Sequence, residues 1–185
     1  RVKTKESNPA VSYTGLGPGD KMEIRVAGKG GGSEAKARFV MLNPADSIVD
    51  WVMKTVPTMG AGWCPPGMLG IGIGGTAEKA MLLAKRSLMD PVDITEISEK
   101  SNQTNIEKLR LELFNKINSL GIGAQGLGGL TTVLDVKIKD YPTHAASQPV
   151  AMIPNCAATR HLHFSLDGSG VAEMPEVDFS VYPDL

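Results

Sequence analysis

Clusters of glycine restrict the fold of this chain more than any other feature of its sequence. Many of the 21 glycines gather at 28–32, 60–75, 121–129 and 168–170. Glycine reaches backbone conformations that other residues avoid, and it lets a neighbouring backbone or a ligand come close. Each cluster is therefore either an ordinary turn between elements or a place where the backbone approaches a partner.

The segments between these clusters carry the periodicities of both helices and strands. The clearest is a helix over 105–120, because its apolar residues recur at spacings of three and four and Gly121 suits a left-handed helix end. Two further helices are expected over 46–59 and 76–89. Strands are expected over 21–26, 68–73, 131–138, 149–153 and 162–166.

Helices and strands intermix without strict alternation, which predicts an α/β or mixed α+β domain with a mixed sheet and flanking helices. The 185 residues suffice for one domain with a hydrophobic core, and 42% hydrophobic against 21% charged residues is an ordinary globular balance. The first six residues contain neither an initiator methionine nor the apolar core of a signal peptide. We therefore expect the chain to be a fragment of a larger domain.

Composition excludes several classes of partner. A formal net charge of -1 gives no electrostatic attraction to nucleic acid or to an anionic membrane. Aromatic residues make up only 5%, too few for stacking platforms that bind single strands. No apolar run approaches the roughly 20 residues that cross a bilayer. Two cysteines do not make a disulfide framework and indicate a reducing compartment, so a cytoplasmic protein is expected.

The segment 70–75 fits the pattern G-x-G-x-x-G, with Gly70, Gly72 and Gly75 at its fixed positions. Between a strand and a helix, such a turn can seat a pyrophosphate, as in nucleotide-dependent oxidoreductases. A dinucleotide site also requires a second strand that ends in an acid about twenty residues further on, and here Pro91 interrupts that stretch. Close packing of the strand against the helix is the commoner reason for such glycines.

The two cysteines lie in segments of unusual composition. Cys64 is followed directly by two prolines, which stiffen its loop and remove two amide donors. Cys156 follows an expected strand, and Arg160 and His161 nearby would favour its thiolate. Neither has a C-x-x-C partner, which argues against a zinc ribbon. A single disulfide, two core thiols and two metal ligands all remain compatible with this spacing.

Histidines and one glycine loop are the other candidate site residues. His144 lies among small residues after a proline, which suits a side chain that faces a cavity and exchanges a proton near neutrality. His161 and His163 alternate on an expected strand and could both be ligands or surface residues. The loop 29–34 could bind a carboxylate through successive amides, or be a plain turn.

Taken together, these segments resemble class I fumarases and the α subunits of L-tartrate dehydratase over roughly residues 8–170. Six blocks occur in the order found in that family: KGGGS at 29–33, CPP at 64–66, GIGGT at 72–76, GIGAQ at 121–125, THAAS at 143–147 and NC at 155–156. Six ordered blocks are specific for the family, but they distinguish fumarate poorly from tartrate.

The resemblance implies a set of site residues. Such enzymes hold a 4Fe–4S cluster with three cysteines and leave one iron open for substrate. Cys64 and Cys156 resemble the second and third of these cysteines, and the first is expected outside this chain, because no cysteine precedes Cys64. His144 resembles the family's substrate-contacting histidine. The carboxylate-contacting glycine loop of the family corresponds to Gly30, Gly31 and Gly32.

The resemblance also implies an activity. It is the reversible dehydration of a 2-hydroxy dicarboxylate, malate to fumarate as in the tricarboxylic acid cycle, with L-tartrate or mesaconate chemistry as the alternative. Residues 1–185 would then form a partial N-terminal or α-type domain, which a C-terminal domain or β subunit completes in an enzyme that is a homodimer. The chain alone is expected to be inactive.

Overall fold

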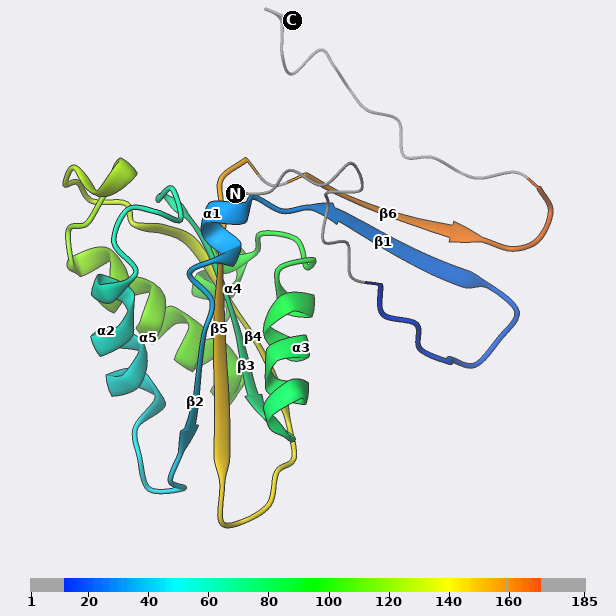
Figure 1. Ribbon diagram of the computed structural model, residues 1–185, viewed down its shortest axis with the longest axis horizontal. Coiled ribbons are helices and arrows are strands. Elements are labelled where there is room, and N and C mark those ends of the chain that lie inside the picture. The colour runs from blue at the N-terminus through cyan, green and yellow to red at the C-terminus, as the bar shows by residue number, and fades with distance from the viewer. Residues whose placement is uncertain (1–11, 159, 171–185) are drawn as a thin grey trace, which may run out of the picture. The chain divides into compact units, whose positions relative to one another are not determined.

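The computed structural model describes residues 12–158 and 160–170 (Figure 1). The features expected of residues 1–6 lie outside this part of the chain. The structure divides into a large unit, Arg25–Leu162, and a small one, whose described residues are 12–24 and 163–170. β1 (Met22–Gly28) and β6 (Arg160–Leu166) pair in a two-stranded sheet, and each unit contains residues of both strands.

The large unit is built on a four-stranded mixed sheet with the strand order β2-β5-β3-β4, which confirms the expected fold class. Its strands are β2 (Arg38–Leu42), β3 (Gly67–Gly74), β4 (Val133–Tyr141) and β5 (Gln148–Cys156). β5 runs antiparallel to both of its neighbours, whereas β3 and β4 are parallel. Consequently β3 and β4 begin at the end of the sheet where β5 terminates.

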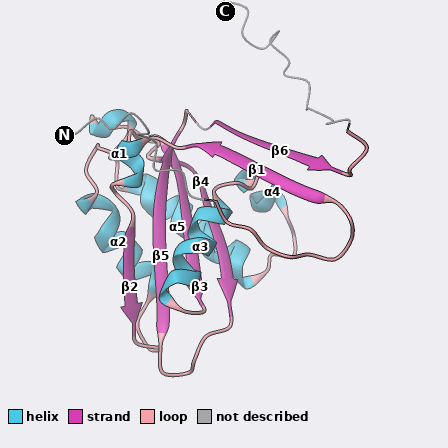
Figure 2. Ribbon diagram, turned by 45° about the vertical axis from the view of Figure 1, so that its right-hand side comes forward, coloured by secondary structure: helices cyan, strands magenta, loops and turns pink. Residues whose placement is uncertain are grey.

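Helices cover both faces of this sheet (Figure 2). α2 (Ile48–Thr58) and α5 (Asn105–Ser119) share one core cluster with β3, β4 and β5, while α3 (Ala77–Ser87) packs on the other face. The shorter helices are α1 (Gly31–Glu34), α4 (Ile94–Glu99) and the 3₁₀ turn η1 (Ala124–Gly126). Among the described residues, no helix is long and apolar enough to span a membrane.

Local sequence signals fix the three long helices where they were expected. A reciprocal capping box between Thr104 and Glu107 starts α5, and hydrogen bonds from Lys100 and from the Thr104 backbone lower the pKa of Glu107 to about 2. Ser47 caps α2 through the amide of Asp50. β2, α4 and α1 were not expected, because each is short and lacks a sustained periodicity.

The glycines of the segment 70–75 serve close packing. A Cβ atom on Gly72 would lie 2.0 Å from the carbonyl oxygen of Ala80, and one on Gly70 would lie 2.3 Å from that of Ala84. α3 therefore presses directly on the backbone of β3. Of the two explanations that the sequence left open for these glycines, the structure favours close packing of the strand against the helix. The G-x-G-x-x-G pattern therefore no longer supports a nucleotide site.

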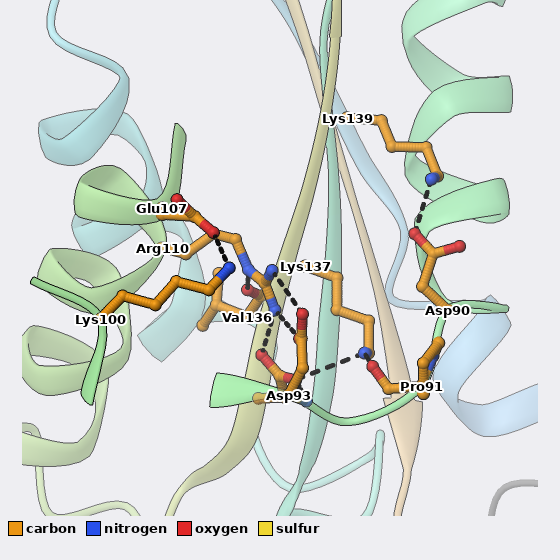
Figure 3. A network of polar contacts seen from close by, with 10 residues as sticks. Asp90, Pro91, Asp93, Lys100, Glu107, Arg110, Val136, Lys137 and Lys139 are labelled. Carbon is orange, nitrogen blue, oxygen red and sulfur yellow. Dashed lines mark hydrogen bonds and ion pairs between the residues drawn. The ribbon is translucent and has the colours of Figure 1, made fainter. Parts of the chain in front are cut away.

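A buried ionic network joins α5, β4 and the segment before α4 (Figure 3). Arg110 Nη2 lies 2.5 Å from Asp93 Oδ1 and 3.0 Å from Asp135 Oδ1. Lys137 Nζ lies 3.3 Å from Asp135 Oδ2 and donates to the carbonyl of Pro91. Burial alone would raise the pKa of Asp93, but the hydrogen bond and charge of Arg110 outweigh it, so this pKa is lowered. The network fixes the start of β4.

We predict that Arg110→Met destabilises the chain by about 3 kcal/mol, because Asp135, whose side chain is 0% exposed, keeps only Lys137 as a charged partner among the described residues. The control is Lys116→Met, which breaks an exposed ion pair with Glu112 and should cost about 1 kcal/mol or less. Urea unfolding at pH 7 measures both. Equal losses in the two variants would contradict a structural role for the buried network.

Candidate functional site

Both cysteines lie at the same end of the four-stranded sheet. Gly67, the first residue of β3, is the register partner of Cys156, the last residue of β5, and also pairs with Val133 at the start of β4. Cys64 precedes Gly67 by three residues, which span at most about 11 Å. This end of the sheet, marked by Gly67, Val133 and Cys156, is hereafter the cysteine end, and it is uppermost in Figure 1.

Neither cysteine forms a disulfide. Cys64 is exposed, whereas Cys156 is half-buried. A disulfide was one of the arrangements that the spacing left open, and the structure does not contain it. Two reduced thiols at the end of one sheet are suited to binding a thiophilic metal centre.

The glycine loop 121–129 packs against the loop that carries Cys64. The amide of Gln125 donates to the carbonyl of Pro65 at 2.6 Å. A Cβ on Gly126 would lie 2.9 Å from the Cβ of Ala61, so only glycine allows this approach. The loop after α5 therefore holds the Cys-Pro-Pro segment from one side.

The glycine loop 30–32 approaches the same segment. A Cβ on Gly32 would lie 2.7 Å from the carbonyl oxygen of Gly62, two residues before Cys64. α1 also contacts β5, the strand that ends in Cys156. The loop of Cys64 and two glycine loops from distant parts of the sequence therefore lie together at the cysteine end. These two loops are 30–32 and 121–129.

Backbone strain is concentrated at this end. Among the described residues, the non-glycine residues with positive φ are Cys64, at 58°, and Gln125, at 54°. A left-handed conformation costs a residue with a Cβ roughly 1–2 kcal/mol and persists only where its surroundings enforce it. The hydrogen bond from Gln125 to Pro65 joins the two strained segments. Sequence analysis placed Gln125 in the family block 121–125 but assigned it no role of its own.

His144 lies at the opposite end of the sheet, in the turn between β4 and β5. β5 has nine residues, and at about 3.3 Å per step this strand separates the turn from Cys156 by about 26 Å. Thr143 Oγ1 donates to the carbonyl of Gly75 at 2.9 Å, so the turn is fastened beside the start of α3. The structure therefore brings Cys64, Cys156 and the loop 30–32 together, and it does not bring His144 to them within one chain.

The ring of His144 has a defined orientation in its exposed turn. Its Nδ1 accepts a hydrogen bond from the amide of Ala146 at 3.1 Å. In the neutral ring the proton is then on Nε2, which makes that atom the donor.

The other histidines do not join the cysteines. His163 Nε2 lies 2.8 Å from Glu23 Oε2 within the small unit, and His161 is exposed on β6. Across residues 12–158 and 160–170, no group of three or more His, Cys, Asp or Glu side chains is placed to hold a metal ion. The described residues thus supply two thiols of a possible centre and no complete ligand set.

Comparisons with known proteins identify the family of this chain. The family model of fumarate hydratase (Fumerase) matches residues 1–165. The chain is 44% identical over 143 residues to the putative L(+)-tartrate dehydratase subunit alpha of Methanocaldococcus jannaschii, which covers 76% of this chain and 48% of that protein. It is 31% identical over 155 residues to the L(+)-tartrate dehydratase subunit alpha of Escherichia coli strain UTI89, covering 82% and 50%. The chain spans about half the length of the curated relatives it matches.

We predict that Cys64→Gly is more stable than Cys64→Ala by about 1 kcal/mol, because only alanine keeps the cost of a left-handed residue with a Cβ. The same pair of substitutions at Glu112, inside α5, should give the opposite order, since glycine weakens a helix interior. Urea unfolding of the four variants measures this. The same order at both positions would show that Cys64 is not held in a strained conformation.

Proposed function

Because the chain belongs to the fumarate hydratase (Fumerase) family, we propose that it is the cysteine-bearing part of a hydro-lyase that reversibly removes water from a 2-hydroxy dicarboxylate. One observation carries this proposal: Cys64 and Cys156, 92 positions apart, lie at one end of a single sheet beside two glycine loops. The chemistry requires a metal centre for the leaving hydroxyl and fixed donors for the carboxylates, and this end of the sheet offers residues for both.

Malate, dehydrated to fumarate, is the first candidate substrate. L-tartrate is the alternative, and the names of the related alpha subunits favour it. Both are 2-hydroxy dicarboxylates, as is the hydrated form of mesaconate, so the same thiols and amides would serve all three.

The donor set fits a 4Fe–4S cluster in part. Two reduced cysteines on loops held by their neighbours are suitable thiolate ligands, and a third cysteine would come from outside this chain. When bound, such a cluster would supply an open iron that acts as a Lewis acid on the departing hydroxyl. Cys64 and Cys156 would hold it at the cysteine end.

The glycine loop would hold a substrate carboxylate. The first internal hydrogen bond of α1 runs from the amide of Glu34 to the carbonyl of Gly30, so the amides of Gly31 and Gly32 precede it and have no acceptor within the helix. Backbone amides positioned in advance bind a carboxylate without reorganisation and orient the substrate for proton removal. Gly30, Gly31 and Gly32 are therefore the proposed carboxylate contacts.

A second copy of the chain would supply His144. About 26 Å separates His144 from Cys156 along β5, so one side chain cannot reach a centre held by the cysteines of its own chain. In a homodimer the exposed turn of one subunit can approach the cysteine end of its partner. There His144 would give a hydrogen bond or a proton from Nε2 to the substrate.

The remaining parts of the enzyme would come from a C-terminal domain or a β subunit. The related proteins are named as alpha subunits, which supports a partner of this kind. The third cysteine and the cationic groups for the second carboxylate would belong to those parts. A reducing compartment such as the cytoplasm suits a protein with reduced thiols.

We predict that the complete enzyme, reconstituted anaerobically with iron and sulfide, turns over at least one of malate, L-tartrate and mesaconate, and that the 185-residue chain alone does not. Cys64→Ser or Cys156→Ser should remove the cluster absorbance at about 400 nm, because each deletes a thiolate ligand. His163→Asn, in the small unit, is the control and should keep it. Unchanged absorbance in a cysteine variant would remove that residue from the site.

We predict that Cys156→Ser and His144→Asn complement each other when the two variants are combined in one dimer. If each site is shared between subunits, one site of the mixed dimer contains both substitutions and the other contains neither. The mixed dimer should therefore show about half of the unmodified activity. Differently tagged subunits and tandem affinity purification isolate this dimer. If each site lies within one chain, the mixed dimer stays inactive, and the proposed role of the second copy is wrong.

A further inference from the structure

Lys29 connects the end of β1 to the glycine loop 30–32, and its ammonium group is directed back onto α1. Its Nζ donates to Ser33 Oγ at 2.9 Å and lies 3.1 Å from Glu34 Oε2, while its side chain is only 13% exposed. A cation removed from water to this extent requires polar partners, and α1 provides both. Burial lowers the pKa of Lys29, and the hydrogen bond and charge of Glu34 oppose this shift without cancelling it.

Ser33 transmits this contact to the loop. It is 3% exposed, and its hydroxyl donates to the carbonyl of Gly30 at 2.9 Å while it accepts from Lys29. The carbonyl of Gly30 also accepts from the amide of Glu34 at 3.1 Å. The carbonyl of Gly30 is therefore held by two donors, the hydroxyl of Ser33 and the amide of Glu34. Lys29 orients the first of them by donating to the same hydroxyl.

Glu34 ties the same loop to α3. Its Oε2 lies 2.5 Å from Lys85 Nζ, so one carboxylate is shared by two lysines and the three side chains carry a net charge of +1. Lys85 pairs with Glu34, whereas the hydroxyl of Ser33 accepts its hydrogen bond from Lys29, and the side chain of Lys85 is more exposed, at 33%. The two lysines thus share a partner and differ in whether they act on the glycine loop.

We infer that Lys29 is a positioning residue that sets the conformation of the loop 30–32 through Ser33, and so determines how tightly the enzyme holds a substrate carboxylate. This inference rests on the proposed role of Gly30, Gly31 and Gly32 in carboxylate binding. Lys29 acts through the loop and through its positive charge, and it does not take part in bond breaking. The sequence contained one signal for it, since Lys29 immediately precedes three consecutive glycines.

The first test is hydrogen exchange of the amides of Glu34 and Ala35, whose hydrogen bonds to the carbonyls of Gly30 and Gly31 hold the loop, measured in the chain by mass spectrometry without cluster or substrate. Lys29→Met should accelerate their exchange about tenfold, the size expected for losing a hydrogen bond from a charged group. Lys85→Met is the matched control and should leave these amides unchanged. Exchange that is equally fast in both variants, or unchanged in both, would overturn the inference.

The second test is steady-state kinetics of the complete enzyme on the dicarboxylate that it turns over. Lys29→Met should raise KM about tenfold while kcat and the cluster absorbance stay within about twofold, and Lys29→Arg should restore most of the affinity. A loss confined to kcat, or a KM that does not change, would overturn the inference. An unmodified enzyme without any turnover would overturn the proposed function instead, and hydrogen exchange would still decide how Lys29 acts on the loop.

Discussion

The antiparallel register between β3 and β5 is the constraint on which the site depends. It places Gly67 opposite Cys156, and the loop of Cys64 leads directly into Gly67. The two strands are so close here that a Cβ on Gly67 would lie 2.2 Å from the carbonyl oxygen of Asn155. Shifting the register by one residue would turn every side chain of a strand to the other face and separate both cysteine segments from their supports.

The cysteine end is built from backbone more than from side chains. The absence of a side chain at Gly32 and Gly126 lets their loops approach the carbonyl of Gly62 and the Cβ of Ala61, and the main-chain hydrogen bond from Gln125 to Pro65 joins two of the loops. This arrangement leaves Cys64 exposed and Cys156 half-buried at the end of a packed scaffold. The left-handed backbone at Cys64 and Gln125 is the cost of bringing these loops together.

The two ends of the sheet divide the family's sequence blocks between them. The blocks that contain Lys29, Cys64, Gln125 and Cys156 lie at the cysteine end, whereas those at 72–76 and 143–147 lie at the other. At that second end, the hydrogen bond from Thr143 to Gly75 holds the two blocks together and leaves His144 exposed. In the proposed enzyme, two associated copies would let both ends serve one reaction, because the sheet is too long for one chain to join them.

Local sequence patterns were enough to predict the mixed α/β class, the approximate bounds of α2, α3 and α5, and all five expected strands, which are β1, β3, β4, β5 and β6. Amphipathic periodicity and capping are local properties, and only the short β2 among the described strands escaped them. The sequence also supplied the family blocks and both cysteines. Tertiary structure alone decided which blocks meet. Cys64 and Cys156 are 92 positions apart yet share one end of the sheet, while His144, only twelve residues before Cys156, lies at the other, because an extended strand separates near neighbours and hydrogen-bonded pairing joins distant ones.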